Sequence, residues 1–330
     1  DVSGLDFAGV CDHANAHLPV QWARIVEWAR QHEAPGRFVT LLGYEGGVAG
    51  KSFHHNVYYP DLEATFEGIE FARGSAMAEE ALRGHLAQTG ALSQLHQSGT
   101  CSTDMREPYF PSTRLIEIFS HWGQSEAYNP DHALSYEVNR VRYPETRLTI
   151  SERGPFYARD AWALGKRYVT IASSDDHNGQ AGKAHRGIAG VYAGSLTRDG
   201  IFGGLKAGSC YATTGERILV DFRCNGQPMG SELAAEPGQA LRFEVEVHGT
   251  DVLCTVEAFR FRFEGDAGWE SVYHEDIPDR GLRGGRQRDL SAAWTEPYQG
   301  PAVYYLRVRQ KYVVRDRPVY AWSTPIWVGA

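Results

Sequence analysis

The segment 168–177, with the sequence YVTIASSDDH, joins a short apolar strand to a run of polar side chains. Residues 168–172 are predicted to form a buried strand, because the run is mostly apolar and contains the β-branched residues Val169, Thr170 and Ile171. The polar run begins where the strand ends and closes on Asp175 and His177. A buried strand followed at once by side chains that can bind a metal is an arrangement that recurs along the first part of the chain.

Four other predicted strands are followed by such a residue. They are residues 5–11 with His13, 38–42 with Glu45, 91–95 with His96, and 115–119 with His121. A helix is predicted to begin at Pro19, and further helices are expected at 77–87, 156–164 and 201–206. Strands that alternate with helices are typical of an α/β domain with a mainly parallel sheet, either open or closed into a barrel.

The pattern changes after about residue 216. From there to residue 330 the chain shows β-rich, partly alternating runs that are separated by Gly and Pro clusters. This pattern predicts an antiparallel β-sandwich of about 110 residues. We therefore expect two domains, with the α/β domain at 1–216 and the sandwich at 217–330.

Composition and charge exclude several classes of protein. The chain has 330 residues, 42% hydrophobic and 22% charged, which is typical of a globular protein rather than a disordered or fibrous one. No apolar run approaches the roughly 20 residues needed to span a bilayer, so no membrane partner is expected. The net charge of −8 argues against nucleic acid as a partner. Any targeting segment is expected to precede Asp1.

The polar residues after the strands predict a metal site. The carboxyl ends of parallel strands share one face of a sheet, so residues far apart in sequence meet there. A single residue of this kind usually caps a helix or lies in a loop, but the repetition at five strands is harder to explain in that way. The five cysteines form no C-x-x-C pair, which argues against a thiolate zinc site. Two or three divalent ions, Zn, Mn or Fe, are expected. The candidate ligands are His13, Glu45, His96, His121, Asp175 and His177.

Several stretches of the chain resemble one known family. These are FAGVCDHA, GYE, HHNVYY, EIFSHWGQSE, IASSDDHNGQAG, YATTGERI and the closing AWSTPIWV. They are similar to the bacterial group called domain of unknown function 3604, a member of the polymerase-and-histidinol-phosphatase (PHP) superfamily of metal-dependent phosphoesterases. The resemblance covers nearly the whole chain.

The resemblance implies a distorted (βα)₇ barrel that carries a site for two or three ions. Each of the six candidate ligands falls on a ligand position of the superfamily pattern, with Glu45 as the bridging carboxylate. The chain departs from that pattern at its start, because the superfamily begins with a strand ending in H-x-H and nothing before Asp6 supplies it. We therefore expect an incomplete barrel.

Four further residues are predicted to support the chemistry. Asp12 precedes a ligand histidine, and we expect it to orient an imidazole rather than take a proton. Of the adjacent pair His54-His55 only one should face the site, and we expect His55 to do so and to bind substrate. Lys183 and Arg186 lie in a Gly-rich loop, where they would hold a phosphate or be solvated charges. Arg186 is the stronger candidate because its planar guanidinium suits bidentate contact.

These features predict a metal-dependent hydrolase that acts on a small, phosphorylated substrate through metal-activated water. The sequence has no nucleophile motif such as G-x-S-x-G, so a covalent enzyme intermediate is not indicated. Two alternatives remain open. The chain hydrolyses an amide or a lactone with the same metals, or it is a catalytically silent metal- or ligand-binding module, as the missing H-x-H strand suggests.

Overall fold

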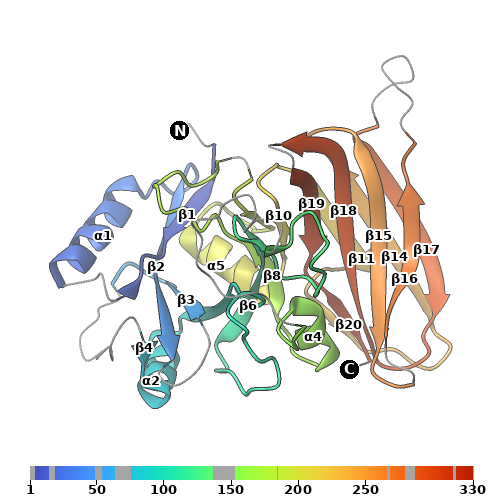
Figure 1. The fold of residues 1–330 in the computed structure, drawn as a ribbon, viewed down its shortest axis with the longest axis horizontal. Helices are drawn as coiled ribbons and strands as arrows, with labels where there is room; N and C mark the ends of the chain where they lie inside the picture. The colour runs from blue at the N-terminus through green and yellow to red at the C-terminus, as the bar shows by residue number, and fades with distance from the viewer. Residues whose placement is uncertain are drawn as a thin grey trace.

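Strands dominate the part of the chain that is described by the computed structural model. The described residues are 4–14, 19–48, 54–63, 76–136, 153–183, 185–265, 268–278, 287–314 and 317–329. Strands make up 43% of these residues and helices 16%. Figure 1 shows a region with helices on the left and two sheets of long strands on the right.

The first sheet, which we call the site sheet, is mixed rather than wholly parallel. Its main strands are β1 (Phe7–Val10), β2 (Val39–Val48), β3 (His54–Tyr59), β5 (Leu92–His96), β6 (Thr113–Ser120) and β8 (Val169–Ala172), with the two-residue strands β4 (Ala76–Met77) and β7 (Gly123–Gln124) beside them. β1, β2, β5, β6 and β8 run in the same direction, whereas β3 is antiparallel to both β2 and β5. The carboxyl ends of the five parallel strands therefore share one edge.

Side-chain alternation gives the site sheet two different faces. One face packs against α1 (Pro19–His32) and α2 (Glu79–Thr89), through a core that includes Trp22 and Leu82. The other face packs against α5 (Arg198–Ala207), whose Phe202 and Leu205 contact a core of residues from β2, β5, β6 and β8. The fourth helix, α4 (Ala158–Ala163), carries Trp162. The ring centroid of Trp162 is 5.0 Å from that of Tyr305, a residue of the long strands near the end of the chain.

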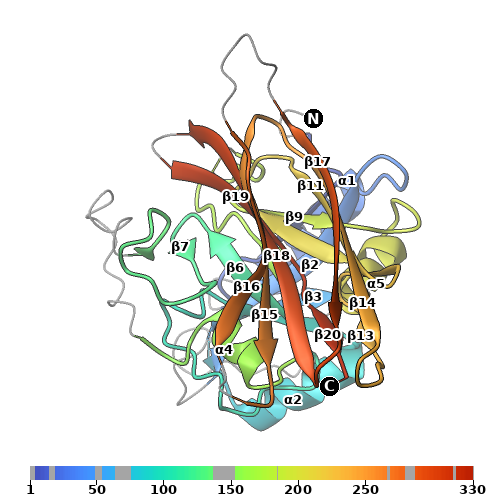
Figure 2. The same cartoon turned by 90° about the vertical axis from the view of Figure 1, so that its right-hand side faces the viewer.

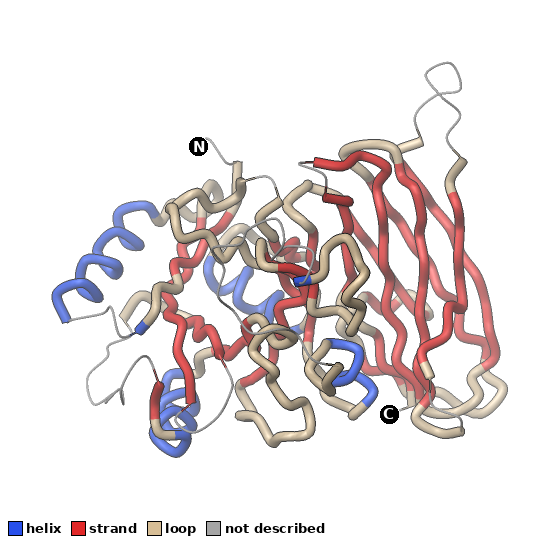
Figure 3. The backbone as a smooth tube through the Cα atoms, in the orientation of Figure 1, coloured by secondary structure: helices blue, strands red, loops and turns tan. Residues whose placement is uncertain are grey.

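The prediction of a (βα)₇ barrel is wrong. The described residues contain four helices, too few to give each strand of such a barrel its own helix. The antiparallel β3 lies between two parallel strands, and among the described strands β1 pairs with β2 alone, so the site sheet does not close. The backbone trace in Figure 3 shows the same preponderance of strands over helices.

Two further sheets face each other over a shared apolar core. The long sheet holds β9 (Ile188–Val191), β10 (Cys210–Thr213), β13 (Glu232–Leu233), β15 (Leu253–Arg262), β16 (Trp269–Asp276), β18 (Ala302–Val314), β19 (Arg317–Ser323) and β20 (Ile326–Val328). The outer sheet holds β11 (Leu219–Cys224), β12 (Gln227–Pro228), β14 (Ala240–His248) and β17 (Asp289–Pro297). Phe222 and Phe243 from the outer sheet share their core with Val256 and Leu306 from the long sheet. Figure 2 shows these long strands facing the viewer.

The long sheet reaches across the predicted domain boundary at 216/217. β9 and β10 precede that boundary, yet β10 pairs with β19 near the end of the chain. The core on the α1 and α2 face of the site sheet likewise includes Tyr305 and Trp322. The two regions are therefore joined by continuous hydrogen bonding and packing. Among the described helices, none is both long enough and apolar enough to cross a membrane.

Candidate metal centre

Three side chains from three different strands or the loops after them meet toward the carboxyl edge of the site sheet. Glu45 lies in β2, His96 is the last residue of β5, and Asp175 follows β8. One ligand atom from each of them lies within 4.8 Å of the others. His96 Nε2 is 3.6 Å from Glu45 Oε2 and 3.5 Å from Asp175 Oδ2. The sequence analysis gave all three as candidate ligands of one site. We call them the carboxylate–imidazole cluster.

The charges of this cluster are strongly coupled. Burial alone would lower the pKa of His96, but the carboxylates of Glu117, Glu45 and Asp175 hold it well above its usual value. Burial would raise the pKa of Glu45 and of Asp175, yet the neighbouring imidazoles, His96 above all, lower both. Without a cation, the two carboxylates are therefore ionised around a positively charged His96.

The face of the sheet on which a residue lies decides which side chains reach the cluster. In β3, His54 lies on the same face as Tyr58, and its Nδ1 is 3.3 Å from Glu45 Oε1. His55 points to the opposite face, where it is fully buried and its ring lies edge-on against Tyr44 at 6.1 Å. The structure thus places His54 at the cluster, whereas the expectation was His55.

His13 and His177 lie at the rim of the cluster. A parallel bridge pairs His13 with Glu45 and puts His13 Nδ1 3.7 Å from Glu45 Oε1. His177 Nδ1 is 3.7 Å from Asp175 Oδ1, and the rings of His13 and His177 are 6.4 Å apart. Both imidazoles are more exposed than His96.

His121 lies farther out than the other candidate ligands. Its ring is 6.5 Å from that of His177 and 4.2 Å from Trp122. Its Nδ1 donates a hydrogen bond to the Ser174 carbonyl at 3.3 Å. Burial and the nearby charge of Arg186 lower the pKa of His121 to about 4, so its ring is neutral at pH 7.

Glu117 is a buried carboxylate of the site that the sequence analysis did not single out. Its side chain accepts hydrogen bonds from His96 Nδ1 and Gln94 Nε2, both at 3.1 Å, and from Ser173 Oγ. The sequence did contain a signal for it, because Glu117 is a charged residue inside the apolar strand LIEIF. Two residues after Leu115, it shares the face of Leu115, which is the face that carries His96.

Two backbone positions beside the cluster have left-handed conformations. Gln97 and Asp175 both have a φ of 46°, which is uncommon for residues other than glycine. Gln97 Nε2 also donates a hydrogen bond to Asp175 Oδ2, which links the loop after β5 to the loop after β8. Such conformations are often found at functional sites, where the surrounding structure holds them in place.

The predicted supporting residues are less closely tied to the cluster. Asp12 lines the cleft beside it, and its carbonyl accepts a hydrogen bond from Glu45 N at 3.0 Å. Arg186 Nη2 is 3.5 Å from Asp176 Oδ1, and Lys183 Nζ donates to Gln180 Oε1 at 2.5 Å. Lys183 and Arg186 are described by the structure but do not line the cleft.

A cleft of about 610 Å³ runs from the cluster along β1. Glu45, His96 and Asp175 line one part of it, and Leu41, Leu115, Ile171 and Tyr211 line another. Part of its wall is formed by β1. Five of the six candidate ligands, all except His121, therefore line a cleft that also has a large apolar part.

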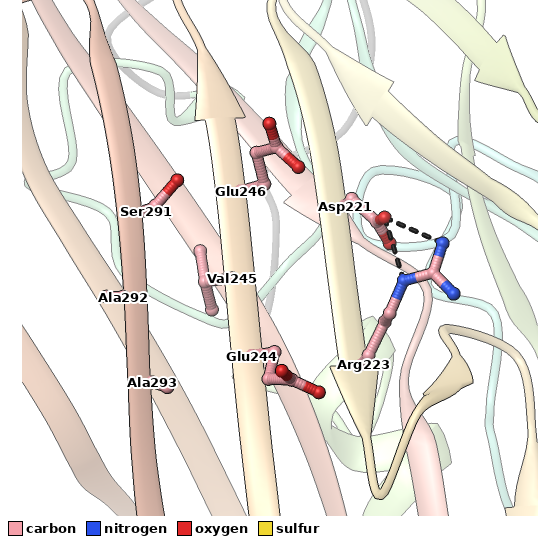
Figure 4. Close-up of a pocket in the computed structure, with 8 residues that line it drawn as sticks. All are labelled: Asp221, Arg223, Glu244, Val245, Glu246, Ser291, Ala292 and Ala293. Carbon is pink, nitrogen blue, oxygen red and sulfur yellow. Dashed lines mark hydrogen bonds and ion pairs between the residues drawn. The ribbon is translucent and has the colours of Figure 1, made fainter.

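A second hollow lies on the outer sheet. Figure 4 shows it between β11, β14 and β17, with Glu244, Glu246 and Asp221 among its side chains. Arg223 is engaged by Asp221, with its Nη2 2.8 Å from Asp221 Oδ2. Among the described residues, the compact group of metal-binding side chains is that of Glu45, His96 and Asp175, and none of the three lines this hollow.

Comparisons with known proteins show that the chain is similar in sequence to proteins from Chlamydia. A Chlamydia pneumoniae protein is 30% identical over 237 residues, which are 67% of this chain and 35% of that protein. A Chlamydia muridarum protein is 30% identical over 230 residues, or 65% of this chain and 34% of its own length. Both carry the name "uncharacterized protein". The chain thus spans about a third of the length of these relatives. No family model matches it, so the resemblance to the PHP superfamily stays a prediction.

Proposed function

We propose that this chain is a metal-dependent hydrolase of phosphoesters whose carboxylate–imidazole cluster holds a divalent ion. The observation that carries the proposal is the meeting of Glu45 from β2, His96 from the end of β5 and Asp175 from the loop after β8, within 4.8 Å. Residues so far apart in sequence converge only because the strands run in parallel, and they converge in a cleft open to a ligand.

The donor set fits a divalent cation. Two ionised carboxylates and one imidazole are ligands that suit Zn, Mn or Fe. A cation between the carboxylates would balance their charge, which in the present arrangement is met by the imidazolium of His96. His13, His54 and His177 surround the cluster and would serve as ligands of one or two further ions. The expectation of two or three ions thus remains part of the proposal.

Residues of the chain itself would bind and orient the substrate. A divalent ion at the cluster would supply Lewis-acid activation of water and of the substrate's oxygens. The hydrogen bond from His121 Nδ1 to the Ser174 carbonyl fixes the orientation of that ring beside His177. Arg186 would neutralise the anionic part of a phosphoester, provided that its guanidinium turns from Asp176 toward the site.

Hydrolysis assays with the purified chain test the proposal. We expect p-nitrophenyl phosphate or its diester to be hydrolysed in the presence of Mn²⁺ or Zn²⁺, and hydrolysis to be lost in Glu45→Gln and Asp175→Asn. Glu296→Gln is the matched control. Glu296 is likewise a largely buried carboxylate, but its ion-pair partner is Arg260 rather than a histidine, and it lies in the outer sheet.

The substrate panel also separates the alternatives. Metal-dependent turnover of p-nitroanilides or lactones without turnover of phosphoesters would show that the chain hydrolyses another kind of bond and is not a phosphoesterase. Metal binding without turnover of any member of the panel would favour a silent binding module. Equal activity in wild type and Glu45→Gln would contradict a catalytic role for the cluster.

A further inference from the structure

Glu117 lies at the centre of a buried hydrogen-bond network beneath the carboxylate–imidazole cluster. Glu117 is 1% exposed. Its Oε2 accepts hydrogen bonds from His96 Nδ1, Gln94 Nε2 and Ser173 Oγ. Gln94 is itself fixed, because its Oε1 accepts a hydrogen bond from Tyr58 OH at 2.7 Å. With the amide oxygen so engaged, the Gln94 NH₂ group is turned toward Glu117.

The contact between Glu117 and His96 determines which ring nitrogen faces the cluster. Nδ1 is held by Glu117 at 3.1 Å, and Nε2 faces Glu45 Oε2 at 3.6 Å and Asp175 Oδ2 at 3.5 Å. When a cation displaces the Nε2 proton of His96, Nδ1 still donates to the carboxylate and the lone pair of Nε2 faces the cation. The orientation of His96 is therefore set from below by Glu117.

We propose that Glu117 is a positioning residue that orients His96 for metal binding, an inference that rests on the proposed function. The burial of Glu117 argues for a specific role, because a buried carboxylate is costly unless its charge is compensated. Among the described residues, the ion pair of Glu117 is with His96. Glu126, another deeply buried carboxylate, pairs instead with Arg159 and Arg307 and stabilises the contact between two sheets.

Titration of the purified chain with Co²⁺, followed by visible absorption, tests this role without an activity assay. Glu117→Gln keeps the size of the side chain but removes its charge, and we expect it to weaken Co²⁺ affinity by about 10- to 100-fold. Glu117→Asp keeps the charge but withdraws it by one methylene, so its affinity should lie between those of wild type and Glu117→Gln. Thermal unfolding of each variant shows whether the fold is retained.

Glu296→Gln is again the matched control, and we expect its Co²⁺ affinity to stay within about threefold of wild type because it is remote from the cluster. Wild-type affinity in Glu117→Gln would overturn the positioning role while leaving the proposed function in place. If Glu117→Gln does not fold, wild-type affinity in Glu117→Asp overturns it instead. A wild-type chain that binds neither Co²⁺ nor Mn²⁺ would overturn the proposed function, and the inference with it.

Discussion

Replacing Glu126 with glutamine removes a buried negative charge that joins the site sheet to the long sheet. The carboxylate accepts hydrogen bonds from Tyr305 OH, from Arg307 Nη1 at 3.1 and 3.2 Å, and from Trp322 Nε1 at 2.9 Å. Arg159 Nη2 lies 3.4 Å from the same carboxylate. Tyr305 and Arg307 lie in β18 and Trp322 lies in β19. The substitution would therefore weaken the contact between the loop after β7 and the long sheet.

The size of the effect follows from the pKa of Glu126. Burial alone would raise this pKa, but Arg307 and Arg159 lower it from 4.5 to about 2. At about 1.4 kcal/mol for each tenfold change in proton affinity, this depression corresponds to roughly 3 kcal/mol of folding stability. Because the folded-state pKa is the lower one, the contribution is present above about pH 5 and is lost as the pH falls toward 2.

Urea unfolding followed by tryptophan fluorescence, at intervals from pH 7 to pH 2.5, measures this contribution. We expect Glu126→Gln to be less stable than wild type by about 3 kcal/mol at pH 7, with the difference shrinking as the medium is acidified. Glu236→Gln, at an exposed position, should stay within about 0.5 kcal/mol throughout. A difference that stays the same from pH 7 to pH 2.5, or one near zero at pH 7, would refute the reasoning.

Two other substitutions test the packing. Phe222 is fully buried and stacks on Phe243 and Trp294 at 6.0 and 6.3 Å, so Phe222→Ala should cost about 3–5 kcal/mol in urea unfolding and leave Co²⁺ affinity unchanged. A Cβ on Gly187 would lie 2.6 Å from the Ser173 carbonyl oxygen, so Gly187→Ala should cost about 1–3 kcal/mol and also weaken Co²⁺ binding. Wild-type stability in either variant would contradict the packing described here.

The sequence predicted most elements of the site sheet but not their directions. The strands expected at 38–42, 91–95 and 115–119 correspond to β2, β5 and β6, because continuous apolar runs mark burial on both sides. Such a run reads the same in either direction, so nothing in it revealed that β3 returns antiparallel to β2. Likewise, the pairing of β10 with β19 depends on residues about 110 positions apart, which local patterns do not report.

The site could be predicted from the sequence where its residues come directly after the apolar runs of parallel strands. Glu45, His96 and Asp175 were found because each follows an apolar run, and the parallel strands do bring those ends together. His54 was misjudged because the choice between two adjacent histidines depends on the register of β3, in which Gly47 pairs with His54. A one-residue slip in register exchanges the faces of every side chain in a strand.

Glu117 shows a different kind of miss. The apolar run continues after it with Ile118 and Phe119, so a search for polar residues that follow apolar runs passes over it. Its charge inside the apolar stretch LIEIF was nevertheless a signal, because a carboxylate is rarely buried without a partner. Combining that rule with side-chain alternation would have placed Glu117 on the same face as His96.

The central claim is that Glu45, His96 and Asp175 hold a divalent ion together. Its most direct test is calorimetric titration of the wild-type chain and of Asp175→Asn with Mn²⁺ and Zn²⁺, with Glu296→Gln as control. We predict about one tightly bound ion per chain or more in wild type and in the control, and a large loss of affinity in Asp175→Asn. Absence of binding in wild type, or unchanged binding in Asp175→Asn, would contradict it.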